Sequence, residues 1–304
     1  MGAVLLKAGI FLCIIAMGYG LKKTGFFRKE DFRVVAKIVL NITLPCAVIS
    51  NFAGLEFDST LVILALFGFL CDMVLLAAGY LVALRRPKEE QAFNVINYTG
   101  YNIGCFTLPY VQSFLGPAAV VSACIFDAGN AVICTSGSYA VGSSVLGKGE
   151  KTTVLRFLKK MFRSVPLDTY LIMLFLTAVG IALPAPLMQF AQTIGGANAF
   201  LAMLMIGIGF EINLDKSRVG RLVKLLVIRF AISGLLSAGF YFLLPFPLEV
   251  RQLMALIVFS PIASAAPAFT QQIEGDIELS STANSLSIII SMTIMTVLLM
   301  GMGI

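Results

Sequence analysis

The sequence predicts an all-α membrane protein with ten transmembrane helices, arranged as two inverted five-helix repeats. Three observations support this prediction. Hydrophobic residues make up 59% of the 304 residues and charged residues only 12%, which is about half the charged content of a soluble domain. Apolar runs of about 20 residues, the length that crosses a bilayer, recur along the whole chain. The basic residues gather in alternate loops between these runs.

The apolar runs leave no stretch long enough for a sizeable soluble domain. The fourth, fifth and ninth runs contain many small and polar residues, which is typical of helices that are buried or interrupted. Closely spaced glycines near Gly195 and Gly207 are interpreted as helix-packing positions. We expect the ten spans at about residues 2–21, 32–53, 59–84, 91–115, 117–146, 166–184, 186–212, 219–245, 249–273 and 279–303.

The distribution of positive charge predicts the orientation. Most of the 22 Lys and Arg residues lie in the loops after the first, third, fifth and seventh spans, whereas the opposite loops are short and carry almost none. By the positive-inside rule the basic loops face the cytoplasm. We therefore expect a multi-pass protein of the cell (plasma) membrane with both termini extracytoplasmic. This topology explains the net charge of +6, so the lipid bilayer is the expected partner and nucleic acid is not.

The longest hydrophilic segment lies near the middle of the chain and separates five spans from five. An odd number of spans in each half forces the second half into the membrane upside down, as in many transporters. We expect a first repeat at 1–147, a cytoplasmic linker at 148–165 and a second repeat at 166–304. A weak internal match supports the division, because spans four and nine each place a proline, then a glutamine and then a glycine in the same order.

Prolines predict an interrupted helix at corresponding positions of the two halves. Pro109 lies within span four, and Pro261 and Pro267 lie within span nine, all beside small and polar residues. Two broken helices that meet near the membrane centre expose backbone groups able to bind an anion. The alternative is that these prolines only kink their helices. The candidate substrate-binding residues are Asn102, Gly104, Thr107, Pro109, Gln112, Asn130, Pro261, Ser264, Pro267, Gln271 and Asn284.

Few ionisable residues fall inside the predicted spans. Asp72 and Asp127 are candidates for proton or ion coupling, because a charge within a membrane is costly and often marks an ion route. The alternative for both is a structural hydrogen bond to another helix. Asp127 shares a helical face with Asn130. Arg229 is expected near the cytoplasmic end of span eight, with its charged group snorkelling to the membrane surface.

Several classes of protein are disfavoured by what the sequence lacks. It contains no histidine, and its six cysteines show neither metal-type nor Cys-x-x-Cys spacing, so no metal or cofactor site is expected. It contains no nucleotide-binding motif, which argues against ATP-driven transport. It has no paired-carboxylate motif, so an enzyme is the least favoured functional class.

The chain resembles the auxin efflux carrier family. The resemblance rests on the run LNITLPCAVI closing span two, on the spacing of Asn102, Gly104 and Pro109, on Pro261 followed by an acidic loop, and on the small and hydroxyl residues that open span ten. The sequence departs from the family at Thr107, where glycine is frequent, and in its additional Pro267.

The resemblance implies the fold of bile-acid symporters, with broken helices 4 and 9 crossing near the membrane centre. It also implies a scaffold of spans 1, 2, 6 and 7, which often forms a homodimer, and a transport unit of spans 3–5 and 8–10. Substrates of such families are carboxylate-bearing organic anions, which include small dicarboxylates and the indole carboxylate auxin. The sequence does not specify the anion, the direction of transport or the driving ion.

The function expected from the sequence is secondary transport, as an efflux carrier of small carboxylate-bearing organic anions that works by alternating access. A non-transporting membrane receptor or sensor built on the same helices is the alternative. The chain contains no signalling domain, which argues against the alternative unless a partner supplies one.

Overall fold

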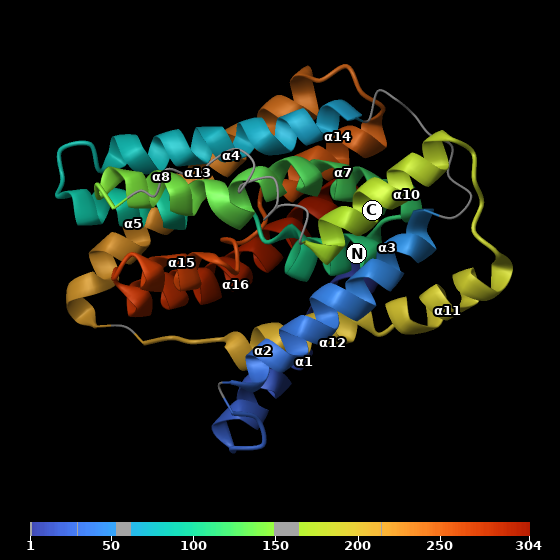
Figure 1. Ribbon diagram of the computed structural model, residues 1–304, viewed down its shortest axis with the longest axis horizontal. Helices are drawn as coiled ribbons and strands as arrows, with labels where there is room; N and C mark the ends of the chain where they lie inside the picture. Colours follow the sequence, from blue (N-terminus) through green and yellow to red (C-terminus); the bar gives the residue numbers. More distant parts are fainter. Residues whose placement is uncertain (1, 29, 53–61, 149–163, 214) are drawn as a thin grey trace.

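The computed structural model describes residues 2–28, 30–52, 62–148, 164–213 and 215–304. Helices dominate this part of the chain, and its β-bridge pairing is limited to an isolated antiparallel bridge between Tyr101 and Ile262. Seven described helices are long and apolar enough to cross a membrane. They confirm a multi-pass helical membrane protein (Figure 1).

These seven helices coincide to within a few residues with the predicted spans 1, 2, 3, 5, 7, 8 and 10. The sixth span appears as the shorter apolar helix α10, Val165–Ala178. The long helices are α1 (Gly2–Lys23), α2 to α3 (Asp31–Phe52, with a π-helical turn at Val39–Thr43), α4 (Ile63–Val82), α7 to α8 (Pro117–Val145, with a π-helical turn at Ile133–Gly137), α11 to α12 (Ala185–Gly209, divided at Gly195), α13 (Val219–Leu243, preceded by a 3₁₀ turn at Lys216–Arg218) and α16 (Ile277–Gly301).

The segment predicted as span four is interrupted. Helix α5 (Lys88–Tyr98) ends in extended backbone at residues 99–102, which we call the first break, before a π-helical turn (Ile103–Thr107) leads into α6 (Leu108–Phe114). Gly100 lies in this break with φ of +84°, a conformation that glycine adopts without strain. A Cβ atom on Gly100 would also approach the Cβ of Ala263 to 2.8 Å.

The segment predicted as span nine is interrupted as well. Helix α14 (Leu248–Ile257) ends before an irregular stretch at residues 258–265, which we call the second break, and α15 (Ala266–Gln272) follows. Pro261 lies inside this break, whereas Pro267 lies in the first turn of α15. Pro109 likewise lies in the first turn of α6, downstream of the first break. A proline is tolerated at the start of α15, because first-turn amides lack helical acceptors. Before Pro109 the chain is a π-helical turn, in which the Leu108 amide donates to the carbonyl oxygen of Ile103.

Glycines allow the helices to pack closely, as expected for Gly195 and Gly207. A Cβ atom on Gly207 would lie 2.2 Å from the carbonyl oxygen of Ile15, and one on Gly195 would lie 2.7 Å from the amide nitrogen of Ala47. Helices in a membrane approach this closely only where side chains are very small. The contacts bind α12 to α1 and α11 to α3, which lie alongside one another in Figure 1.

Contacts between loops distant in sequence show which connections share one end of the bundle. The Lys22 Nζ atom donates to the carbonyl oxygen of Phe210 at 2.5 Å, and Lys148 Nζ lies 3.4 Å from a carboxylate oxygen of Glu274. Because Arg218 also pairs with Asp276, the connections after the first, fifth, seventh and ninth predicted spans share one end, as the charge pattern predicts. At the other end, Lys7 Nζ donates to the carbonyl oxygen of Ser113 at 2.6 Å.

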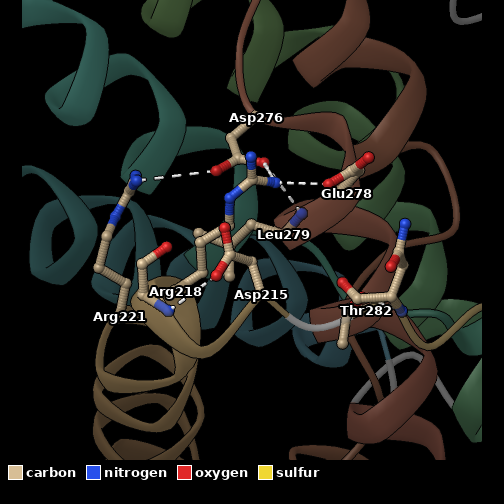
Figure 2. A network of polar contacts seen from close by, with 9 residues as sticks. Asp215, Arg218, Arg221, Asp276, Glu278, Leu279 and Thr282 are labelled. Atoms are coloured by element: carbon tan, nitrogen blue, oxygen red, sulfur yellow. Dashed lines mark hydrogen bonds and ion pairs between the residues drawn. The ribbon is translucent and has the colours of Figure 1, made fainter.

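A charged network ties the beginnings of α13 and α16 together at the basic end (Figure 2). Arg218 Nη1 lies 2.9 Å from Asp276 Oδ1 and 2.7 Å from Glu278 Oε2, and Arg221 Nη1 lies 3.8 Å from Asp276 Oδ2. Asp276 also accepts a hydrogen bond from the amide of Leu279 and so caps α16. Two basic residues after the seventh span are thus paired with the acidic residues after the ninth.

Candidate substrate-binding site

A cavity of about 610 Å³ extends from the basic end of the bundle to the two breaks. Glu30 and Arg33 line it near the α1–α2 connection, while Asn102 from the first break and Ser264 from the second line its inner end. Ser264 is exposed although its neighbours Ile262 and Ala263 are buried. The cavity therefore brings solvent from the basic end to the breaks.

The two walls of the cavity differ in chemistry. Helix α12 contributes the apolar residues Met205, Ile206 and Ile208. Helices α15 and α16, on the opposite side, contribute amide and hydroxyl groups, which belong to Gln271, Ser281, Asn284 and Ser285. An apolar wall with a few convergent polar groups is the usual composition of a small-molecule site.

The two breaks lie against each other. Tyr101 and Ile262 form the antiparallel bridge, and the amide nitrogen of Asn102 donates to the carbonyl oxygen of Pro261 at 3.0 Å. Thr107 Oγ1 donates to Ser260 Oγ at 2.6 Å, in a fully buried contact. Segments that are about 150 residues apart in the sequence therefore satisfy each other's polar groups, which an apolar interior requires.

The side chain of Asn130, on α7, holds the first break. Its Oδ1 atom accepts a hydrogen bond from the amide of Tyr101, and its Nδ2 atom donates to the carbonyl oxygen of the same residue, both at 3.0 Å. Asn130 is 2% exposed. The two bonds imitate a strand partner for backbone that has left the helix, so the side-chain amide of Asn130 stabilises the break.

The side chain of Asn284, on α16, holds the second break in a comparable way. Its Nδ2 atom donates to the carbonyl oxygens of Ile262 at 2.9 Å and Ala263 at 3.2 Å. Ser287 adds a bond, because its Oγ atom accepts from the amide of Ile262 at 3.0 Å. Asn130 on the fifth predicted span and Asn284 on the tenth thus have equivalent roles, because each forms hydrogen bonds with the backbone of one break.

Two charged side chains lie at the same place. Asp72, on α4, accepts a hydrogen bond from the amide of Gly100 at 3.1 Å. Arg229, on α13, donates to the carbonyl oxygens of Tyr98 and Gly100 in the first segment, and of Ser260 and Pro261 in the second. Both Asp72 and Arg229 are 0% exposed.

The expectation that Arg229 snorkels to the membrane surface is therefore wrong. Arg229 is the eleventh residue of α13, so at 1.5 Å per residue its Cα lies about 15 Å from the start of the helix. A snorkelling side chain reaches toward water, whereas this guanidinium group turns inward to the backbone carbonyls of both breaks. The interrupted backbone supplies carbonyl acceptors that a regular helix would not leave free.

Asp127, on α7, lies beside the first break and connects it to α10. Its Oδ1 atom accepts from Asn130 Nδ2 at 2.7 Å, and its Oδ2 atom accepts from the hydroxyl of Tyr170 at 3.1 Å. Gly104 lies next to this pair, since a Cβ atom there would be 3.7 Å from both Asp127 Oδ2 and the Tyr170 hydroxyl. Asp127 therefore has two partners, one from its own helix and one from the sixth predicted span.

The structure separates the candidate binding residues into three groups. Asn102, Ser264, Pro267, Gln271 and Asn284 line the cavity. A second group lies at the contact between the breaks without lining the cavity, and a third neither lines the cavity nor takes part in that contact. The second group is Thr107, Asn130 and Pro261, and the third is Gly104, Pro109 and Gln112.

Sequence reasoning missed part of the site. Tyr170 gave no signal, because one tyrosine in an apolar run is ordinary, and the apolar wall around Met205 looks like any lipid-facing stretch. Arg229 did give a signal, as a charge inside a span, but its depth was misjudged. Within the described residues, no cluster of three or more Cys, Asp or Glu side chains is arranged to hold a metal ion.

A cavity that ends at two broken helices inside an apolar bundle is the arrangement of a membrane transport protein. The chain belongs to the membrane transport protein family, the family of the auxin efflux carriers, whose model matches residues 8–299. An uncharacterized transporter of Methanothermobacter thermautotrophicus is 25% identical over 289 residues, which cover 92% of each chain.

Proposed function

We propose that this membrane transport protein is a secondary transporter of small carboxylate-bearing organic anions, working by alternating access as an efflux carrier. The observation behind the proposal is the cavity that opens at the basic end and reaches the side chains of Asn102 and Ser264 at the breaks. No described protein group forms a hydrogen bond with the Asn102 side-chain amide, which leaves it available to a ligand. The ends of discontinuous helices bind ions and anionic groups in many transporters.

The composition of the cavity narrows the substrate. Its inner end offers the Asn102 amide and the Ser264 hydroxyl, which suit one carboxylate. The facing wall is apolar at Met205 and Ile206, which suits an aliphatic or aromatic body. A carboxylate with one apolar end therefore fits the inner part of the cavity better than a short dicarboxylate, whose second charge would lie against that wall and away from Arg33 near the α1–α2 connection.

We further propose the complete architecture of ten spans in two inverted repeats, with spans four and nine crossing at the breaks. The matching roles of Asn130 and Asn284 support it, because an inverted repeat places such residues symmetrically about the membrane centre. Spans 1, 2, 6 and 7 form the scaffold and the homodimer interface, and spans 3–5 and 8–10 form the moving unit. The cavity lies between α12 of the scaffold and α15 and α16 of the moving unit.

The proposed orientation puts the basic loops in the cytoplasm of a cell whose plasma membrane holds the protein, with both termini outside. Single cysteines at Lys88 and Gly116, in a background without native cysteines, should then react with a membrane-impermeant reagent from opposite sides. Lys88 follows the third predicted span and Gly116 follows the fourth. Reaction of both from the same side would refute the repeat assignment.

Transport itself is tested by uptake of labelled carboxylates into proteoliposomes. We expect saturable uptake of an apolar monocarboxylate, such as an indole or branched-chain carboxylate, with weaker competition from dicarboxylates of similar length. Specific binding to purified protein without any flux would favour the receptor alternative. A cavity variant, Ser264→Trp, is the negative control, because the indole ring would fill the inner end of the cavity.

Asp127 is the proposed site of proton coupling, and Asp72 is a second candidate. Asp127 joins the moving unit to Tyr170 on the scaffold helix α10, so a change in its charge would alter the contact that must break during movement. We expect Asp127→Asn to abolish the pH dependence of transport while the protein stays folded. Tyr170→Phe is the companion variant. If Asp127→Asn has the same pH profile of transport as the native protein, Asp127 has only a structural role.

A further inference from the structure

The Arg229 guanidinium group fills a cage of backbone carbonyl oxygens contributed by both breaks. Gly100 accepts from Nη2 at 2.8 Å, Pro261 at 3.3 Å and Ser260 at 3.4 Å, and Tyr98 accepts from Nη1. The guanidinium carbon also lies 5.2 Å from the centre of the Tyr101 ring. The group is fully buried, since Arg229 is 0% exposed.

A buried charge in a membrane protein is costly unless its surroundings compensate for it. Here carbonyl dipoles and an aromatic face supply the compensation. Asp72 adds a carboxylate close by, since its Oδ1 atom accepts from the amide of Gly100, while its Oδ2 atom has no hydrogen-bond partner among the described residues. The surroundings thus favour one positive charge at this point whatever group provides it.

Carbonyl oxygens of unwound backbone are the ligands with which membrane proteins bind Na⁺ and K⁺. We propose that the cage is a monovalent-cation site that this chain fills permanently with the Arg229 guanidinium, and that the cage takes up a free alkali cation when the guanidinium is removed. The charged group is tethered to α13 and holds Tyr98, Gly100, Ser260 and Pro261 in place. The contact between the breaks therefore needs no cation from solution.

One consequence rests on the proposed function. If the cage is filled permanently, substrate flux through the native protein does not depend on Na⁺, so replacing Na⁺ with N-methyl-D-glucamine should leave uptake unchanged. The cage itself is tested without substrate, by thermal unfolding of purified protein. Failure of the stability test would leave the transport proposal standing, and absence of flux would leave the cage proposal standing.

The stability experiment compares the native chain with Arg229→Ala in NaCl, KCl and N-methyl-D-glucamine chloride at equal ionic strength. We expect Arg229→Ala to lower the melting temperature by about 5 °C or more, because four backbone carbonyl groups lose their buried donor. Na⁺ or K⁺ should restore part of the loss in a saturable way, and the large organic cation should not. Arg251→Ala is the matched control, because Arg251 donates to one carbonyl, that of Tyr241, away from the breaks.

The proposal is overturned if Arg229→Ala shows no preference for small cations, or if Na⁺ selectively stabilises the native chain. If Arg229→Ala does not fold, Arg229→Lys and Arg229→Gln decide the question. Lysine keeps the charge and should melt well above glutamine, which keeps only hydrogen-bond donors. Equal melting temperatures for these two variants would show that the cage does not require a positive charge, and would also overturn the proposal.

Discussion

Replacing Asn102 with alanine is expected to weaken substrate binding about tenfold to a hundredfold while leaving the stability of the protein nearly unchanged. A hydrogen bond to a charged group contributes roughly 1.5–3 kcal/mol, which corresponds to that loss in affinity. The stability should be unchanged because the substitution keeps the backbone amide of Asn102, which donates to the carbonyl oxygen of Pro261. The side-chain amide lines the cavity and forms no hydrogen bond with any described residue.

The measurement is the dissociation constant of a labelled carboxylate for purified, monodisperse variants. Asn94→Ala is the control, because Asn94 is a half-buried asparagine of the same predicted span that does not line the cavity. Ser264→Ala should show a smaller loss in the same direction. Native affinity in both Asn102→Ala and Ser264→Ala would place the binding site away from the breaks.

Replacing Asn130 with alanine is expected to have the opposite signature, a large loss of stability. The change removes three hydrogen bonds at once, two to the backbone of Tyr101 and one to Asp127. Each buried polar group left without a partner costs roughly 1–3 kcal/mol, so the total should reach several kcal/mol. The yield of folded protein and its melting temperature should both fall clearly.

The control for this variant is Asn41→Ala, because Asn41 is exposed and makes one hydrogen bond, to the carbonyl oxygen of Lys37. Asn284→Ala should fall between the two, since Asn284 serves two carbonyl groups and Ser287 still holds the amide of Ile262. An Asn130→Ala variant as stable as Asn41→Ala would mean that the first break does not depend on its asparagine partner.

The long membrane-crossing helices were predictable because a bilayer imposes a simple rule on sequence. A helix must be apolar for about 20 residues to cross it, so the long helices appear directly in the hydropathy pattern. The interrupted helices were predictable for the converse reason, since Asn102, Ser264 and Pro261 are poorly suited to a regular lipid-facing helix. Their contact across the two halves makes these residues tolerable.

What the sequence could not provide was the pairing of distant groups. Pro109 was the more visible signal in span four, yet the chain leaves the helix near Gly100, whose positive φ only the folded backbone reveals. Arg229 is surrounded by carbonyls of residues 98–100 and 260–261, and no local pattern in α13 indicates such partners. The apolar wall at Met205 is likewise defined by what faces it across the cavity.

The central claim, that the breaks form a substrate site reached alternately from the two sides of the membrane, is tested most directly by labelling Ser264→Cys. The residue lies at the inner end of the cavity and is exposed to it. In a cysteine-free background, an impermeant reagent should modify it from either side during transport, and substrate should protect it. Gln271→Cys, on the same wall, should react only from the basic side. Labelling of Ser264→Cys from one side alone, during active flux, would contradict alternating access at the breaks.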